Sequence, residues 1–148
     1  MLPAFTPAGL LPPGVYRATW EELRDRFGGN SRRQEILQGL RHALRALAIA
    51  GCRRVWVDGS FITLEPFPSD WDGCWDPQGV DPARLEHAFT DFSTGARQQM
   101  KIKYLADLFP ASITEAASGL LFVQYFQIDK ATGDPKGIVV VDLTGGSP

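Results

Sequence analysis

The chain has 148 residues, which suits one domain and leaves little room for a second. Hydrophobic residues make up 44% of it, so the sequence can bury a core and is not typical of a disordered protein. The formal net charge of −2 excludes a global positive field for nucleic acid. No apolar run is long enough to span a bilayer and no signal peptide is evident, so we expect a soluble, cytoplasmic protein with no membrane contact.

The first half of the chain predicts an arm and two helices. Residues 1–18 are rich in proline and glycine, which favours an extended arm lying over a single domain at 19–148. Thr19 and Glu22 have the spacing of a capping box, which predicts a short helix at about Trp20–Phe27. Ser31 and Gln34 repeat this spacing before a longer helix with apolar residues at Ile36, Leu37, Leu40, Leu44, Leu47 and Ala48. Its arginines are expected to form a solvated face: Arg32, Arg33, Arg41 and Arg45.

The rest of the chain predicts mainly strands. A short β-branched segment, Arg53–Val57, comes before Asp58-Gly59 and is expected to be a strand. Residues 90–99 are expected to be loop, and helix is favoured over strand for Ile113–Gln127. The other expected elements are strands at Ser69–Trp75, Lys101–Phe109 and Gly137–Leu143, and a short helix from Asp81 to Phe89. Helices mixed with strands predict an α/β (α+β) domain, a small mixed sheet flanked by helices.

One pattern carries chemistry: a Gly-Ser pair, nine residues, then D-x-D, at Gly59, Ser60, Asp70 and Asp72. On a strand, Asp70 and Asp72 would project to the same face, where two like charges need a cation. Carboxylate oxygens favour Mg²⁺ or Mn²⁺, which bind few carboxylates and recruit substrate phosphates. Gly59 lets the backbone approach a phosphate, and Ser60 can donate hydrogen bonds to it. A nucleoside triphosphate is therefore the expected ligand.

This pattern resembles the polymerase-beta-type nucleotidyltransferase superfamily over about Arg53 to Phe109. Three segments together also look like a short, little-characterised bacterial nucleotidyltransferase-like family: Leu11-Pro12-Pro13-Gly14, Asp58-Gly59-Ser60-Phe61 and Pro135-Lys136-Gly137-Ile138. The resemblance implies a minimal nucleotidyltransferase fold and a third carboxylate that binds metal and accepts the acceptor's proton, a role we give to Asp107. Lys136 becomes a candidate contact for the nucleotide.

The resemblance further implies transfer of a nucleoside monophosphate from a triphosphate to a protein or RNA acceptor, within a toxin–antitoxin or defence module. The alternative is an inactive nucleotidyltransferase-fold module with a binding, regulatory or antitoxin-like role, and a third possibility is a structural subunit without a ligand. In an active enzyme Asp107 should converge on Asp70 and Asp72, whereas in a binding module it would pair with a cation such as Lys103. Base preference, acceptor and oligomeric state have no signal in the sequence.

Each residue in the pattern also has a structural interpretation. Asp58-Gly59-Ser60 can be a tight turn after a strand, and Asp70 and Asp72 can be turn acids. Basic residues outside the pattern can be solvated: Arg97, Lys101, Lys103 and Lys136. Neither His42 nor His87 has a partner at metal-ligand spacing. Aromatic residues near the acids are expected to pack in the core: Phe61, Phe67, Trp71 and Trp75.

Overall fold

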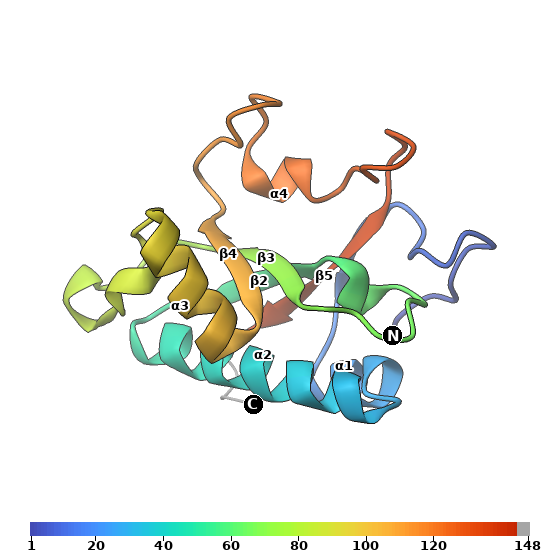
Figure 1. The fold of residues 1–148 in the computed structure, drawn as a ribbon, viewed down its shortest axis with the longest axis horizontal. Coiled ribbons are helices and arrows are strands. Elements are labelled where there is room, and N and C mark those ends of the chain that lie inside the picture. The colour runs from blue at the N-terminus through green and yellow to red at the C-terminus, as the bar shows by residue number, and fades with distance from the viewer. Residues whose placement is uncertain (145–148) are drawn as a thin grey trace.

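The structure is a computed structural model that describes residues 1–144. Five strands form one mixed sheet in the order β1-β5-β2-β3-β4 (Figure 1). β1 runs parallel to β5 and β3 parallel to β4, whereas β2 is antiparallel to both of its neighbours. The strands are β1 (Gly14–Arg17), β2 (Arg54–Asp58), β3 (Trp71–Trp75), β4 (Ala106–Pro110) and β5 (Gly137–Asp142). A small mixed sheet flanked by helices confirms the predicted α+β class.

The helices lie on different sides of the sheet. They are α1 (Trp20–Phe27), α2 (Ser31–Ile49), α3 (Thr94–Tyr104) and α4 (Phe122–Tyr125). In Figure 1, α1 and α2 run along one side of the sheet, α3 lies beside β4, and α4 with its connecting loops lies on the opposite side. None of the helices described is both long and apolar enough to cross a membrane.

Of the two capping boxes predicted at the start of the domain, the structure confirms the first and replaces the second. The Glu22 amide donates to the Thr19 hydroxyl at 3.1 Å and the Thr19 amide donates to the Glu22 carboxylate at 3.4 Å, so the capping box forms. α2 is capped one residue earlier than expected, because Asn30 accepts from the Arg33 amide at 2.9 Å. The apolar stripe of α2 is buried at Ile36, Leu37, Leu40, Leu44 and Leu47.

The end of the predicted arm belongs to the sheet. Residues 14–17 form β1, which pairs with β5 along its whole length. Leu11 is buried, and the Tyr16 hydroxyl donates to the Pro12 carbonyl at 2.8 Å. These contacts tie the arm to the last strand of the sheet.

Four predictions for the segment after residue 80 are wrong in whole or in part. The expected strand Lys101–Phe109 begins only at Ala106, because residues 94–104 form α3, and so the expected loop at 90–99 is half helix. Ser93 caps α3, and Leu105 ends it in the left-handed conformation with φ 52°. The expected helix at Ile113–Gln127 is reduced to α4, and the one at Asp81–Phe89 to two short 3₁₀ helices.

The two faces of the sheet differ in chemistry. The face towards α2 is apolar and includes Val55, Val57, Trp71, Leu108 and Val139, each with an exposed fraction of 0%. Because side chains alternate along a strand, the intervening residues of β2, β3 and β4 project to the other face. Those residues include Asp58, Asp72 and Asp107, so these three acids share the face that α4 covers.

Candidate active site

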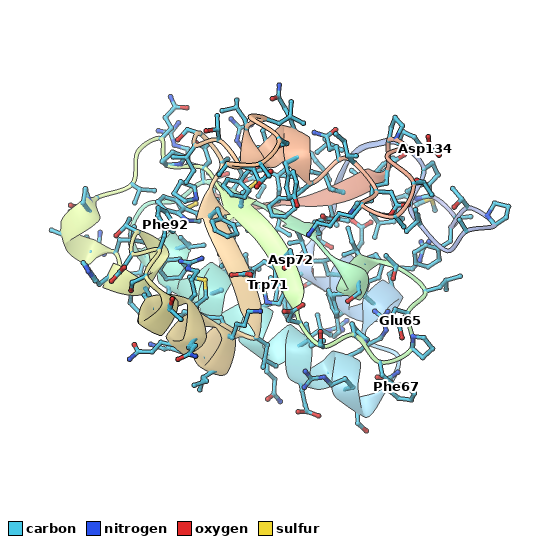
Figure 2. All side chains as sticks on the ribbon, turned by 45° about the horizontal axis from the view of Figure 1, so that its top comes forward. Glu65, Phe67, Trp71, Asp72, Phe92 and Asp134 are labelled. Atoms are coloured by element: carbon cyan, nitrogen blue, oxygen red, sulfur yellow. The ribbon has the colours of Figure 1, made fainter. Side chains whose placement is uncertain are left out.

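Three aspartates stand in register on three neighbouring strands. Asp58 at the end of β2 is opposite Asp72 on β3, and Asp72 is opposite Asp107 on β4. Asp70 lies one residue before β3, so the expected strand-face argument holds for Asp72 and not for Asp70. Figure 2 shows Asp72 near the middle of this face. We call Asp58, Asp72 and Asp107 the acid row.

Gly59 brings the Gly-Ser pair against the acid row. Its φ is +89°, a conformation that favours glycine, and a Cβ there would lie 2.9 Å from the Asp72 amide nitrogen and 3.0 Å from Asp72 Oδ2. Ser60 begins a 3₁₀ helix at Ser60–Ile62, and its carbonyl accepts from the Thr63 amide at 3.2 Å and the Thr63 hydroxyl at 2.7 Å. The predicted turn at Asp58-Gly59-Ser60 therefore forms, and it places Gly59 in contact with Asp72.

Two arginines of α2 hold the loop between the two halves of the motif. The Arg33 side chain donates to four carbonyls, those of Phe27 at 3.1 Å, Phe61 at 2.6 Å, Thr63 at 2.7 Å and Glu65 at 2.5 Å. Arg32 donates to the carbonyls of Pro68 at 3.0 Å and of Ser69. The predicted solvated face is thus wrong for both arginines, because loop carbonyls without strand partners need donors.

The Asp58 end of the row is neutralised. Asp58 is buried, and its carboxylate forms an ion pair with the Lys136 ammonium, whose side chain is only 11% exposed. Burial raises the pKa of Asp58, while the Lys136 charge opposes that rise. Lys136, a predicted nucleotide contact and alternatively a solvated lysine, therefore joins the start of β5 to the end of β2.

Asp72 has no such partner. Among residues 1–144, no lysine, arginine or histidine nitrogen forms a salt bridge with its carboxylate. Burial, and then the negative charges of Asp70 and Asp58, raise the pKa of Asp72 to about 7. Asp72, at the centre of the acid row, is therefore surrounded by other acids and forms no salt bridge among the described residues, and the Lys130 charge only partly opposes the rise in its pKa.

Asp107 and Asp70 share a lysine. Lys101 Nζ lies 3.7 Å from Asp70 Oδ2 and 3.9 Å from Asp107 Oδ2, and Arg97 lies 3.7 Å from Asp107 Oδ1. Lys103, the cation considered from the sequence, instead binds Glu86 at 2.9 Å. No three His, Cys, Asp or Glu side chains in the described part of the chain are arranged as a metal-binding group.

Two cavities flank Asp72. One, the Gly-Ser cavity, has a volume of about 280 Å³ and is lined by Asp58, Gly59, Ser60 and Lys136. The other, the aromatic cavity, has a volume of about 420 Å³, and its lining includes Asp107, Phe92, Phe109 and Phe122. Asp72, Tyr125, Phe126 and Lys130 line both. The acid row thus lies along two adjoining spaces of different chemistry.

The sequence analysis missed Lys130. Its ammonium lies 5.4 Å from the centre of the Tyr125 ring. Partial burial favours the neutral amine, but Tyr125 and the charges of Asp72 and Asp58 together raise the pKa of Lys130. Lys136 is committed to Asp58, so Lys130 is the cation of the Gly-Ser cavity that is available to a phosphate. Its position after the aromatic cluster at Phe122, Tyr125 and Phe126 is the only sequence signal we find for it.

Of the predictions for the aromatic residues and Arg97, some are confirmed and others are wrong. Phe61, Trp71 and Trp75 are buried as expected, but Phe67 is 72% exposed and does not pack in the core. Arg97 is not solvated, because its guanidinium donates to the carbonyls of Leu108 and Ala88 and its side chain is 15% exposed.

Comparison with family models matches residues 3–142 to a family described as a family of unknown function, DUF6932. The comparisons with curated proteins and with solved structures give no match. The matched segment contains the Gly-Ser pair, the complete acid row, both lysines of the Gly-Ser cavity and all five strands. Because the match spans far more than half of the chain, the protein belongs to DUF6932, a family of unknown function.

Proposed function

We propose that the protein is a Mg²⁺-dependent nucleotidyltransferase that moves a nucleoside monophosphate from a nucleoside triphosphate to a protein or RNA acceptor. One observation carries the proposal: Asp72 is flanked in register by Asp58 and Asp107, forms no salt bridge among the described residues, and has Gly59 packed against it. This arrangement brings together the Gly-Ser pair and Asp72 of the D-x-D pair, which are separate in the sequence.

The donor set suits a hard divalent cation. The carboxylates of Asp70, Asp72 and Asp107 offer only oxygen, the ligand type that Mg²⁺ and Mn²⁺ prefer. Burial and the neighbouring acids raise the pKa of Asp72, and a bound cation would favour its ionised form. When bound, Mg²⁺ would neutralise phosphate charge and make the phosphorus more open to attack. Lys101, which contacts Asp70 and Asp107, would have to release both.

The residues of the two cavities can divide the work of the reaction. Gly59, Ser60 and Lys130 would hold the terminal phosphates in the Gly-Ser cavity. Asp107 would accept the proton of the attacking hydroxyl, while the new bond forms to the α-phosphorus and the bond to the leaving pyrophosphate breaks. Lys136 would position Asp58 and the cavity wall beside the phosphates.

The test is transfer of α-³²P label from each of the four ribonucleoside triphosphates, with Mg²⁺, into fractions of a bacterial cell lysate. The proposal predicts labelling by the wild type, none with a chelator, and none with the Asp70→Asn, Asp72→Asn variant. Asp25→Asn, an exposed acid on α1, is the matched control and should label normally. Equal labelling by the wild type and the double variant would contradict the proposal.

A second candidate is the inactive binding module, a nucleotide-binding, antitoxin-like partner. The contacts of Asp107 with Arg97 and Lys101 favour it, because they engage the carboxylate that catalysis needs free. It predicts Mg²⁺-dependent nucleotide binding with no transfer of label. For either role we propose a cytoplasmic location, supported by two buried cysteines that are free thiols.

A further inference from the structure

The position of the aromatic cavity bears on which acceptors the site can use, and this step rests on the proposed function. Phosphoryl transfer requires the attacking and leaving oxygens to be roughly in line across the phosphorus. If the pyrophosphate leaves in the Gly-Ser cavity, on the β2 side of Asp72, the attacking hydroxyl must come from the β4 side. The aromatic cavity lies on that side and includes Asp107 in its lining.

We infer that the acceptor carries a flat aromatic ring next to its nucleophilic hydroxyl, and that this ring occupies the aromatic cavity. The rings of Phe109 and Phe122 are stacked with centres 4.2 Å apart and planes 1° apart, and Phe92 lies 6.0 Å from Phe109 at 29°. The Arg97 guanidinium lies 5.0 Å above Phe109 and 5.2 Å above Phe92. Phe109 and Phe122 cover one face of each other, so the stack offers its outer faces and edges to a planar group, chiefly at Phe92, which is 47% exposed.

The polar groups of the cavity place the hydroxyl. Asp107 is the member of the acid row that lies on β4, and its side chain is 31% exposed, so a ligand can reach it. The acceptor hydroxyl would lose its proton to Asp107 as its oxygen bonds to the α-phosphorus. A volume of about 420 Å³ holds one ring with its immediate substituents. The shared chemistry, a ring beside a hydroxyl, occurs both in nucleosides and in phenols.

Ligand-observed NMR with small probes tests this without any need for catalysis. The ring-bearing probes are adenosine and N-acetyltyrosinamide, and the ring-free control is N-acetylserinamide. We expect both or one of the ring-bearing probes to bind the wild type at least tenfold more tightly than the control. The stronger of the two identifies the source of the ring. Equal binding of all three probes would overturn the inference.

Two variants locate the probe. Phe92→Ala removes a ring that is 47% exposed, and Ala116→Trp fills the cavity from an exposed loop position without removing a packed side chain. Each should weaken the ring-bearing probe at least tenfold, whereas Phe67→Ala, on a distant exposed ring, should not. Unchanged binding in both cavity variants would place the probe elsewhere and overturn the inference.

The same samples separate this inference from the proposed function. Titration with Mg²⁺ and a non-hydrolysable ATP analogue should show equal binding of the analogue to wild type and Phe92→Ala, with the ring-bearing probe still bound to the wild type. Absence of nucleotide binding to the wild type would overturn the proposed function and not the ring site. Displacement of the probe by the analogue would place the nucleotide's own base in the aromatic cavity and overturn the inference alone.

Discussion

Asp58 and Asp72 are neighbours in the acid row, yet the protein treats them in opposite ways. Asp58 is buried and has a dedicated ammonium, that of Lys136, reached across the fold from the start of β5. Asp72 is half-buried, lies between other acids and has no ion-pair partner among the described residues. Burial acts on both carboxyls, but only Asp58 has a direct counter-charge.

Under the proposed function, this difference separates a structural acid, Asp58, from a metal-binding one, Asp72. A carboxylate that is already paired inside the protein interacts weakly with a ligand. A buried carboxylate without an ion pair lowers the stability of the fold, and a bound cation would restore that stability. The Asp58 end would therefore hold β2 and β5 together, and the Asp72 end would bind Mg²⁺ and phosphate. Substitutions at the Asp58 end and at the Asp72 end should therefore change stability and ligand binding in different ways.

The largest effect should come from breaking the Asp58 ion pair. Lys136→Met leaves a buried carboxylate uncompensated, and we expect a loss of about 4 kcal/mol in the free energy of unfolding, measured by urea denaturation. Adding Asp58→Asn should recover most of the loss, because the buried charge is then absent. Stability equal to wild type in the single variant would mean that the ion pair does not hold the two strands.

Substitution of Asp72 is expected to raise, not lower, the free energy of unfolding. Its pKa rises from 3.8 to about 7 on folding, so the folded state loses stability as the pH rises through that range and the carboxyl ionises. Asp72→Asn should therefore be more stable than wild type by roughly 3 kcal/mol at pH 8. The difference should vanish near pH 4, where the wild-type carboxyl is protonated when folded. A difference independent of pH would contradict the assignment.

A smaller loss of stability is expected when the contacts between α2 and the loop that joins the Gly-Ser pair to the D-x-D pair are removed. Arg33→Met removes donors to four carbonyls, and we expect destabilisation of about 2 kcal/mol, since part of the loop can turn to water instead. The loop amides of residues 61–69 should exchange with deuterium faster. Arg84→Met, on an exposed 3₁₀ helix, is the matched control. Unchanged exchange would show that the arginine does not order the loop.

The smallest effect on stability should come from Lys101. Its ion pairs with Asp70 and Asp107 are half-exposed, so Lys101→Met should change the unfolding free energy by less than about 1 kcal/mol. Removing this competing cation should instead tighten Mg²⁺ binding severalfold in isothermal titration calorimetry. Weaker Mg²⁺ binding in the variant would mean that Lys101 supports the site rather than competes for it.

The sequence predicts those elements whose structure is determined by residues close together in the chain. The capping box of Thr19 and Glu22 fixes α1, and the run Ile138–Val141 identifies β5, because each signal is local. The Gly-Ser and D-x-D spacing likewise led to residues that the fold brings together. α3 was missed because its cap, Ser93, and its buried face at Met100 and Tyr104 lie in a segment that is otherwise polar.

What the sequence does not predict is long-range pairing. Asp58 and Lys136 are 78 residues apart, and nothing near either one identifies the other. The same holds for Arg33, whose charge suggests solvent and whose partners are carbonyls of a distant loop. Lys130 enters the site only because the segment after β4 folds back over the acid row. Such contacts depend on the whole topology rather than on a pattern.

The most direct test of the central claim is calorimetric titration of a non-hydrolysable nucleoside triphosphate into the protein, with and without Mg²⁺. The account predicts binding by the wild type only when Mg²⁺ is present. It also predicts no binding by the Asp70→Asn, Asp72→Asn variant, with the Asp58–Lys136 pair and the fold intact. Binding that is equal in the two proteins, or that does not depend on Mg²⁺, would contradict a metal–nucleotide site at Asp72.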